Sequence, residues 1–158
     1  IRIVPSLQRV AELERARYLA AADLDWSIDQ RQELLKKVGE TGHKTAPIDP
    51  EICFQHVRLC TLRTHETLLE AGAPAGFVYI PLTGGLNIIP LGGYETVKAQ
   101  AWMPLGVTSV IRGAARNASI VAEQDVQLLM IPHEVYLKYW HFTYNLKELI
   151  DLLSPPAA

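Results

Sequence analysis

The sequence predicts an α+β fold in which a run of about eight short strands lies between helices at both ends of the chain. Three observations predict it. Apolar residues recur at helical spacing over roughly the first 50 residues. From residue 57 to residue 131 they form short runs separated by turns that contain Gly or Pro. Helical spacing then returns after Pro132. Short strands at such regular spacing are typical of a β-sandwich or a barrel.

Length and composition restrict the class of protein. The 158 residues are enough for one domain with a sizeable hydrophobic core, and 49% apolar with 20% charged residues indicates a globular chain. A net charge of −2, with no basic block beyond Lys36-Lys37, gives no reason to expect nucleic-acid binding. No apolar run approaches the ~20 residues of a membrane span, and no signal-peptide pattern is present. Cys53 and Cys60 fit reduced, buried thiols, so we expect a cytoplasmic protein.

The first predicted helix is a surface helix with one apolar stripe and Ser6 as a candidate cap. Glu12, Glu14 and Arg15 are expected to lie away from that stripe. The stripe either packs on the strands or contacts a second subunit, so a homodimer or a partner protein bound through the flanking helices is one expectation. The residues of the stripe are Leu7, Val10, Leu13, Arg17, Ala21 and Leu24.

The second predicted helix has clear signals at both ends. Ser27 to Gln30 fits a capping box, and Gly39 is a stop signal. Its apolar face consists of Leu34, Leu35 and Val38. Residues 40–48 are interpreted as a linker. Asp49-Pro50-Glu51 has the cap, first-position proline and first-turn acid of a short helix that reaches about Gln55.

The elements in the rest of the chain are predicted from changes in the spacing of its apolar residues. Pro132 is expected to start a helix with Val135, Tyr136, Tyr139 and Trp140 on its apolar face, and a second helix is expected over Asn145–Leu153. The chain is thereby divided into helices at 1–50, strands at 51–131, and helices at 132–158 that belong to the same domain. The expected strands cover 57–62, 66–70, 77–80, 86–89, 96–102, 120–122 and 126–131.

One stretch, Leu105–Ala122, combines several features of an anion site. Gly106 permits a close approach or a positive φ. Thr108 and Ser109 open a segment that can form one helical turn, whose exposed N–H groups favour an anion. Arg116 lies just before an apolar run, so its guanidinium is expected near the mouth of a strand.

The same residues also fit ordinary surface structure. In that interpretation Gly106 makes a turn, and Arg116 forms an exposed ion pair with Glu123 or Asp125 that contributes little to stability.

The order of elements around this stretch resembles the cyclic nucleotide-binding domain family. Phe77–Ile88, with Gly84 in its turn, resembles the early hairpin of that family, and Glu66–Gly72 is similar to the turn before it. Leu105–Ala122 aligns without a gap to the phosphate-binding cassette, with Leu105-Gly106-Val107 at its start and Arg116-Asn117-Ala118-Ser119 at its end. The resemblance extends over about residues 54–153.

The resemblance implies a fold and a function. The fold is an eight-stranded antiparallel β-roll, jelly-roll-like, with flanking helices, and the function is regulatory signalling with cAMP or cGMP as ligand. In the family an arginine pairs with the cyclic phosphate, amides at the start of a short helix bind the same phosphate, and a glutamate accepts a hydrogen bond from the ribose. Carried over, the ligand-binding positions are Gly106, Val107, Thr108, Ser109, Arg116, Asn117, Ala118 and Ser119.

The cassette departs from the family pattern at the sugar contact. Val107 stands where the glutamate is expected, and Ala115 and Asn117 also differ from the usual residues. A hydrogen bond to a carboxylate contributes ~1.5–3 kcal/mol, so its loss weakens binding roughly ten- to a hundredfold or more. We therefore expect a divergent member with a degenerate pocket that binds cAMP or cGMP weakly or not at all.

Two alternatives remain at this stage. One is a working cAMP or cGMP sensor in which Asn117, Thr108 or Ser109 replaces the glutamate and the ligand regulates a partner allosterically. The other is a site for a different anion.

We find no case for catalysis, and the expected protein is not an enzyme and has no metal or cofactor. The five histidines form no His-x-His pair and fall in different predicted elements. Nucleophile elbows, P-loops and Cys-x-x-Cys motifs are absent from the sequence. The histidines are His43, His56, His65, His133 and His141.

Overall fold

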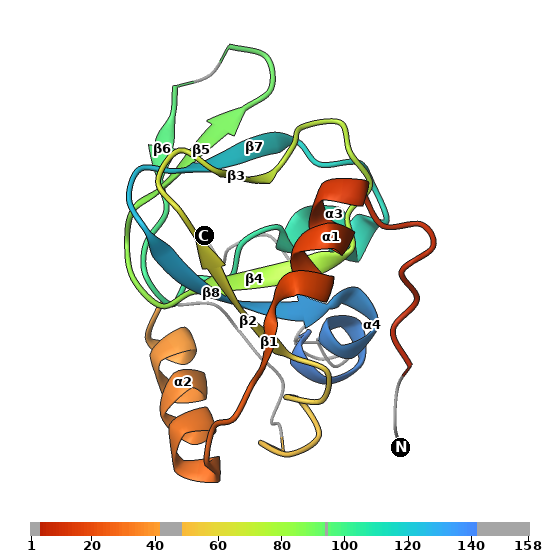
Figure 1. Ribbon diagram of the computed structural model, residues 1–158, viewed down its shortest axis with the longest axis vertical. Helices are drawn as coiled ribbons and strands as arrows, with labels where there is room; N and C mark the ends of the chain where they lie inside the picture. Colours follow the sequence, from red (N-terminus) through yellow and green to blue (C-terminus); the bar gives the residue numbers. More distant parts are fainter. Residues whose placement is uncertain (1–3, 42–48, 94, 142–158) are drawn as a thin grey trace, which may run out of the picture.

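The computed structural model describes residues 4–41, 49–93 and 95–141 (Figure 1). In chain order its elements are α1 (Glu12–Ala20), β1 (Ala22–Asp23), α2 (Ile28–Glu40), β2 (Arg58–Leu62), β3 (Thr67–Leu69), β4 (Phe77–Pro81), β5 (Leu86–Pro90), β6 (Val97–Lys98), α3 (Val107–Arg112), β7 (Ala118–Ala122), β8 (Val126–Pro132), α4 (His133–Val135) and the π-helix η1 (Tyr136–Trp140).

The eight strands form two four-stranded sheets, and every neighbouring pair is antiparallel. We call β1-β2-β8-β4 sheet A and β3-β7-β5-β6 sheet B. The predicted α+β class, with antiparallel strands between helices, is confirmed. Two details of the strand prediction are wrong. β1 lies within the predicted first helix, and β6 has two residues where the sequence favoured a strand over 96–102.

Alternation along the strands of sheet A builds two cores. Phe77 and Tyr79 of β4 point toward sheet B, where they join residues of β3, β5 and β7 in the inner core. Val78 and Ile80 point the other way, into an outer core that α2 and η1 complete with residues such as Trp140. Because the side-chain period of a strand is two, one strand can serve both cores.

The N-terminal helix differs from its prediction in extent and in orientation. It begins at Glu12 with Ala11 as N-cap and no side-chain cap, so the predicted cap at Ser6 is wrong. Val10 and Tyr18 lie in the inner core, which confirms packing on the strands. Glu14 is 0% exposed, so the expectation that it lies away from the packed side is wrong. The helix is turned so that this carboxylate enters the core.

The second helix agrees closely with its prediction. Ser27 Oγ accepts a hydrogen bond from Gln30 N at 3.3 Å, and Ser27 N donates to Gln30 Oε1 at 2.9 Å, which completes the capping box. The helix extends one residue past Gly39. Most of the predicted linker, 42–48, lies outside the described residues.

The predicted short helix at 49–55 is replaced by hydrogen-bonded turns. Its first bond is helical, because Cys53 N donates to Asp49 O at 3.0 Å. The chain then leaves helical geometry. Trp140 Nε1 donates to Cys53 O at 2.6 Å, and His56 takes a positive φ of 59°.

The C-terminal helix is confirmed as far as it is described. Pro132 ends β8, paired with Phe77, so the helix starts one residue later than predicted. Its buried residues are Val135, Tyr136 and Trp140. The predicted helix over 145–153 lies outside the described residues.

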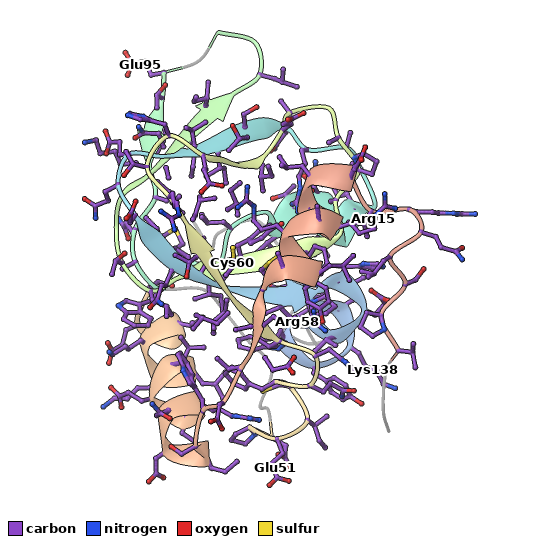
Figure 2. All side chains as sticks on the ribbon, viewed as in Figure 1. Arg15, Glu51, Arg58, Cys60, Glu95 and Lys138 are labelled. Atoms are coloured by element: carbon purple, nitrogen blue, oxygen red, sulfur yellow. The ribbon has the colours of Figure 1, made fainter. Side chains whose placement is uncertain are left out.

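Two further findings concern the whole fold. Cys53 and Cys60 are free and buried, as predicted, and Figure 2 shows Cys60 beside strand β2, near the centre of the molecule. Over the described ranges, none of the helices is both long and apolar enough to cross a membrane.

The capping box supplies a test of this fold. We expect Ser27→Ala to lower the free energy of unfolding by ~1 kcal/mol, because the backbone N–H of Gln30 at the start of α2 loses its acceptor, Ser27 Oγ. Urea denaturation measures the change. Ser6→Ala is the matched control, and it should change stability by less than ~0.5 kcal/mol because Ser6 is exposed and caps no helix. Equal effects of the two substitutions would contradict this description of the N-terminal region.

Candidate functional site

Arg116 is held at the edge of sheet B by two backbone hydrogen bonds to the loop before β4. Arg116 N donates to Ala73 O at 2.8 Å, and Gly72 N donates to Arg116 O at 2.8 Å. This pairing precedes β7 and directs the side chain into the molecule, where Arg116 is 2% exposed. An arginine with so little exposure requires a charge partner and hydrogen bonds to offset the loss of water.

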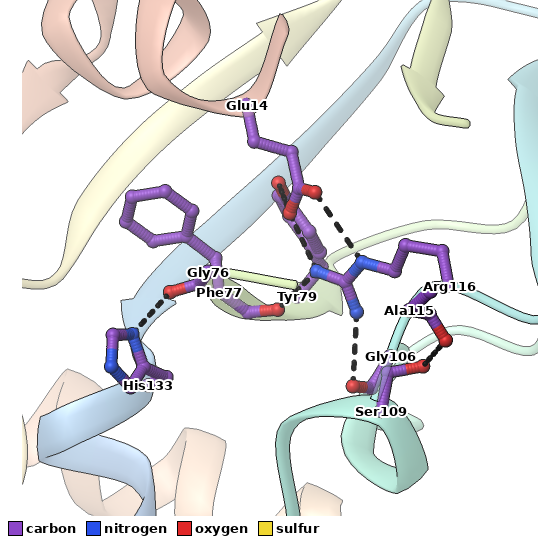
Figure 3. A network of polar contacts seen from close by, with 9 residues as sticks. All are labelled: Glu14, Gly76, Phe77, Tyr79, Gly106, Ser109, Ala115, Arg116 and His133. Carbon is purple, nitrogen blue, oxygen red and sulfur yellow. Dashed lines mark hydrogen bonds and ion pairs between the residues drawn. The ribbon is translucent and has the colours of Figure 1, made fainter. Parts of the chain in front are cut away.

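The chain itself supplies the charge partner and the hydrogen bonds of the Arg116 guanidinium (Figure 3). Nη2 donates to Glu14 Oε1 at 2.5 Å and to Phe77 O at 2.7 Å. Nε donates to Glu14 Oε2 at 3.3 Å, and Nη1 donates to Gly106 O at 3.0 Å. Each nitrogen has a partner, and the two carboxylate oxygens bind two nitrogens of one fork, which is the strongest geometry of an arginine–carboxylate pair.

Tyr79 completes the network around the carboxylate. Its hydroxyl donates to Glu14 Oε1 at 2.9 Å. Burial, together with the nearby negative charge of Glu14, raises the pKa of the Tyr79 phenol well above its usual value. The phenol therefore keeps its proton and remains a donor to the carboxylate.

The alternative ion pairs expected for Arg116 are wrong. Glu123 lies 3.5 Å from Lys98 Nζ. Asp125 accepts hydrogen bonds from the backbone and hydroxyl of Thr64. Arg116 instead makes a buried pair with Glu14, more than a hundred residues away in sequence.

Gly106 brings the backbone close to the guanidinium. It has a φ of 78° and is the N-cap of α3, and its carbonyl accepts from Arg116. A Cβ at this position would overlap Arg116 Nη1. Both properties expected of this glycine, a positive φ and a close approach, are therefore present.

The other predicted site residues lie in α3, in β7 and just before β7. Val107 is half-buried and packs against the outer core. Ser109 is buried and its Oγ donates to Ala115 O at 3.3 Å, while Ser119 Oγ accepts from Ala71 N at 2.9 Å. Thr108 and Asn117 are exposed, and Ala118 is half-buried in β7.

Glu14 is the residue that the sequence interpretation missed. A signal for it exists, because Val10, Glu14 and Tyr18 are spaced by four residues and so share one side of a helix. The predicted apolar stripe passes through Leu13 and Arg17, which lie on a neighbouring side of the helix. A glutamate between two core residues indicates a buried partner, although the sequence does not say which basic residue it is.

No group of three or more His, Cys, Asp or Glu side chains within residues 4–41, 49–93 and 95–141 is arranged to hold a metal ion. His43 falls outside these ranges.

Comparisons with known proteins identify the fold. A family model described as the cyclic nucleotide-binding domain matches residues 59–140. No curated protein shows significant similarity to the chain in sequence.

Several solved structures share the architecture at low sequence identity. The sensor domain of the transcriptional regulator DNR from Pseudomonas aeruginosa has a TM-score of 0.56 and 17% identity, over 70% of this chain and 77% of that chain. In another DNR structure, with a TM-score of 0.59 and 16% identity over 73% of this chain, the match spans 52% of the other chain. A cyclic nucleotide-binding domain from Methylobacillus flagellatus KT has a TM-score of 0.56 and 20% identity, over 70% and 66% of the two chains. PKAR CBD2 with bound Sp-2Cl-cAMPS has a TM-score of 0.60 and 12% identity, over 71% and 75%.

The buried pair predicts a strong coupling energy between two residues far apart in sequence. We expect Glu14→Gln to lower the free energy of unfolding by about 3 kcal/mol, because it leaves a buried guanidinium without its counter-charge. Arg116→Gln should cost a similar amount, and the double variant should cost at least ~2 kcal/mol less than the sum. Urea denaturation measures the cycle. Glu12→Gln, an exposed change on the same helix, should stay within ~0.5 kcal/mol, and additive single effects would contradict the pair.

The close approach at Gly106 predicts a difference between two glycines that both have positive φ. Gly113→Ala should lower the free energy of unfolding by ~1–2 kcal/mol, since Gly113 has a φ of 61° and open space around it. Gly106→Ala should cost at least ~1.5 kcal/mol more, because the new methyl group displaces Arg116 from hydrogen bonds to charged partners. Denaturation of both variants gives the comparison, and equal losses would show that Arg116 does not depend on the missing Cβ.

Proposed function

Since the chain belongs to the cyclic nucleotide-binding domain family, we propose that it is a regulatory or interaction module of that family whose pocket binds cAMP and cGMP weakly or not at all. The module is not an enzyme in this proposal. Its effect on a partner is exerted by binding, through the helices that flank the strands.

The observation that carries the proposal is the engagement of Arg116. The family resemblance assigns this arginine to the cyclic phosphate, and here the same guanidinium binds the carboxylate of Glu14 with Nη2 and Nε. A cyclic phosphate carries one negative charge, so it and Glu14 would repel each other at one buried arginine. A nucleotide must therefore replace the carboxylate before it can bind.

The positions around the cassette support weak binding as well. Val107 has no hydrogen-bond acceptor in its side chain, so it cannot make the ribose contact that the resemblance assigns to the family glutamate. Its side chain packs on the outer core. Ser109 is bonded to Ala115 O. Thr108 and Asn117 are exposed. These placements give no support to the alternative in which one of the three polar residues replaces the family glutamate.

The proposed partner is a protein or a second copy of the chain that contacts the flanking helices. Regulator neighbours such as DNR support a regulatory role at the level of the family. Leu19 of α1 and Ile28 of α2 are exposed apolar residues on these helices. They are available to an interaction surface, although scattered exposed apolar residues are also common in monomers.

Calorimetric titration of the wild-type chain with cAMP and with cGMP tests the proposed function. We expect no saturable binding at micromolar concentrations, with linear adenosine monophosphate as the control for non-specific heat. A thermal unfolding series adds a second measurement. A ligand at a hundred times its Kd stabilises a protein by about 2.7 kcal/mol, so a tight ligand raises the melting temperature clearly. A micromolar or tighter Kd for either cyclic nucleotide would overturn the degenerate pocket.

A further inference from the structure

The carboxylate at the site comes from a different part of the chain from the groups that donate hydrogen bonds to it. Arg116 and Tyr79 belong to the strand region, whereas Glu14 belongs to α1. We propose that Glu14 is a tethered ligand of the roll's own anion site, and that a free oxyanion, either a cyclic phosphate diester or inorganic phosphate, binds Arg116 only when α1 leaves. This inference rests on the proposed function, because it identifies what keeps a nucleotide out.

The donor groups are oriented without the help of α1. The carbonyls of Phe77 and Gly106 accept from Nη2 and Nη1, which fixes the plane of the Arg116 guanidinium. The left-handed backbone of Gly106 leaves room for this arrangement. What remains for Glu14 is the side of the fork formed by Nη2 and Nε, with the Tyr79 hydroxyl beside it. A carboxylate and a phosphate both fit such a fork through two oxygens.

α1 is attached to the strands by ring stacking and hydrogen bonds, but one of its buried donors has no partner in the described part of the chain. Tyr18 stacks on Phe77 with ring centroids 4.8 Å apart, and its hydroxyl donates to His56 O at 2.6 Å. Arg17 Nη2 donates to Thr67 O at 2.7 Å, yet Arg17 Nε is buried with no hydrogen-bond partner among the described residues. A buried donor left unpaired weakens the attachment of the helix that carries it.

The helix is short and leaves space beside the site. α1 has nine residues and no side-chain cap, so it depends on its contacts with the roll to stay helical. Figure 1 shows it at the front of the molecule, and the two-residue strand β1 follows it. A cavity of about 570 Å³ lies between α1 and the loop before β4, and Glu12, Glu14, Glu70 and Ala73 are among its lining residues.

Substitution of Glu14 tests the tethered ligand directly. Wild type, Glu14→Gln, Glu51→Gln and the double variant Glu14→Gln/Arg116→Gln are each titrated with cAMP, cGMP and inorganic phosphate by NMR, which measures millimolar binding. We expect Glu14→Gln to bind at least one of these at least tenfold more tightly than wild type. Glu51→Gln, an exposed change outside α1, should behave as wild type, and the double variant should lose the gain. A gain for phosphate and nucleotides alike assigns the site to oxyanions in general, and a gain for nucleotides alone assigns it to the cyclic diester. No gain in a folded Glu14→Gln protein overturns the inference.

A second variant keeps the test decisive if Glu14→Gln fails to fold. Tyr18→Phe removes the hydroxyl bond to His56 O and leaves the Glu14–Arg116 pair intact. Amide hydrogen exchange over residues 12–20 should become at least threefold faster, and the apparent affinity for the oxyanion should rise by the same factor, because it tracks the fraction of molecules with α1 released. Faster exchange without a gain in affinity overturns the inference.

The two proposals fail in different ways. If the wild type binds a cyclic nucleotide tightly and residues 12–20 then lose their exchange protection, the degenerate pocket is wrong and the tethered ligand is right. If neither the wild type nor a folded Glu14→Gln protein binds, the weak pocket is right and the tethered ligand is wrong.

Discussion

The ion pair between Glu14 and Arg116 is the interaction on which the rest of the structure depends. Both side chains are almost fully buried, so each would be very unfavourable alone. Their hydrogen bonds join α1, the first residue of β4, the turn before α3 and the residue pair that leads into β7. Four segments that are distant in sequence therefore meet at one guanidinium, and the position of each is constrained by the need to pair a buried charge.

Strand β4 connects this site to the outer part of the molecule. Its inward residues, Phe77 and Tyr79, contribute a carbonyl and a hydroxyl to the pair, while Val78 and Ile80 lie in the outer core with Trp140 of η1. Sheet A thus has the charge network and α1 on one face, and α2 and η1 on the other. The proposed regulatory role agrees with this arrangement, since a change on the inner face of β4 lies one residue away from the contacts of η1 and α2.

A carboxylate of the chain itself and a free ligand also differ in their effective concentration at Arg116. Glu14 is attached to the roll through a short connection, so its effective concentration at Arg116 is high and does not depend on the cell. A free oxyanion competes against that fixed concentration and against the contacts of Tyr18 and Arg17. The family's anion-binding arginine can therefore be retained with its charge satisfied and its side chain ordered, in a chain whose sugar contact is missing at Val107.

Local sequence patterns predict the features that depend only on neighbouring residues. The capping box at Ser27, the strand through Phe77 to Ile80 and the positive φ of Gly106 follow from local chemistry, and the spacing from Gly106 to Arg116 is part of the family resemblance. The tertiary structure alone decided what Arg116 binds. Helical spacing places Glu14 and Tyr18 on one side of α1, but the choice of Glu14 over Glu123 or Asp125 as partner depends on which carboxylate is buried beside the guanidinium, and burial is set by the packing of elements distant in sequence.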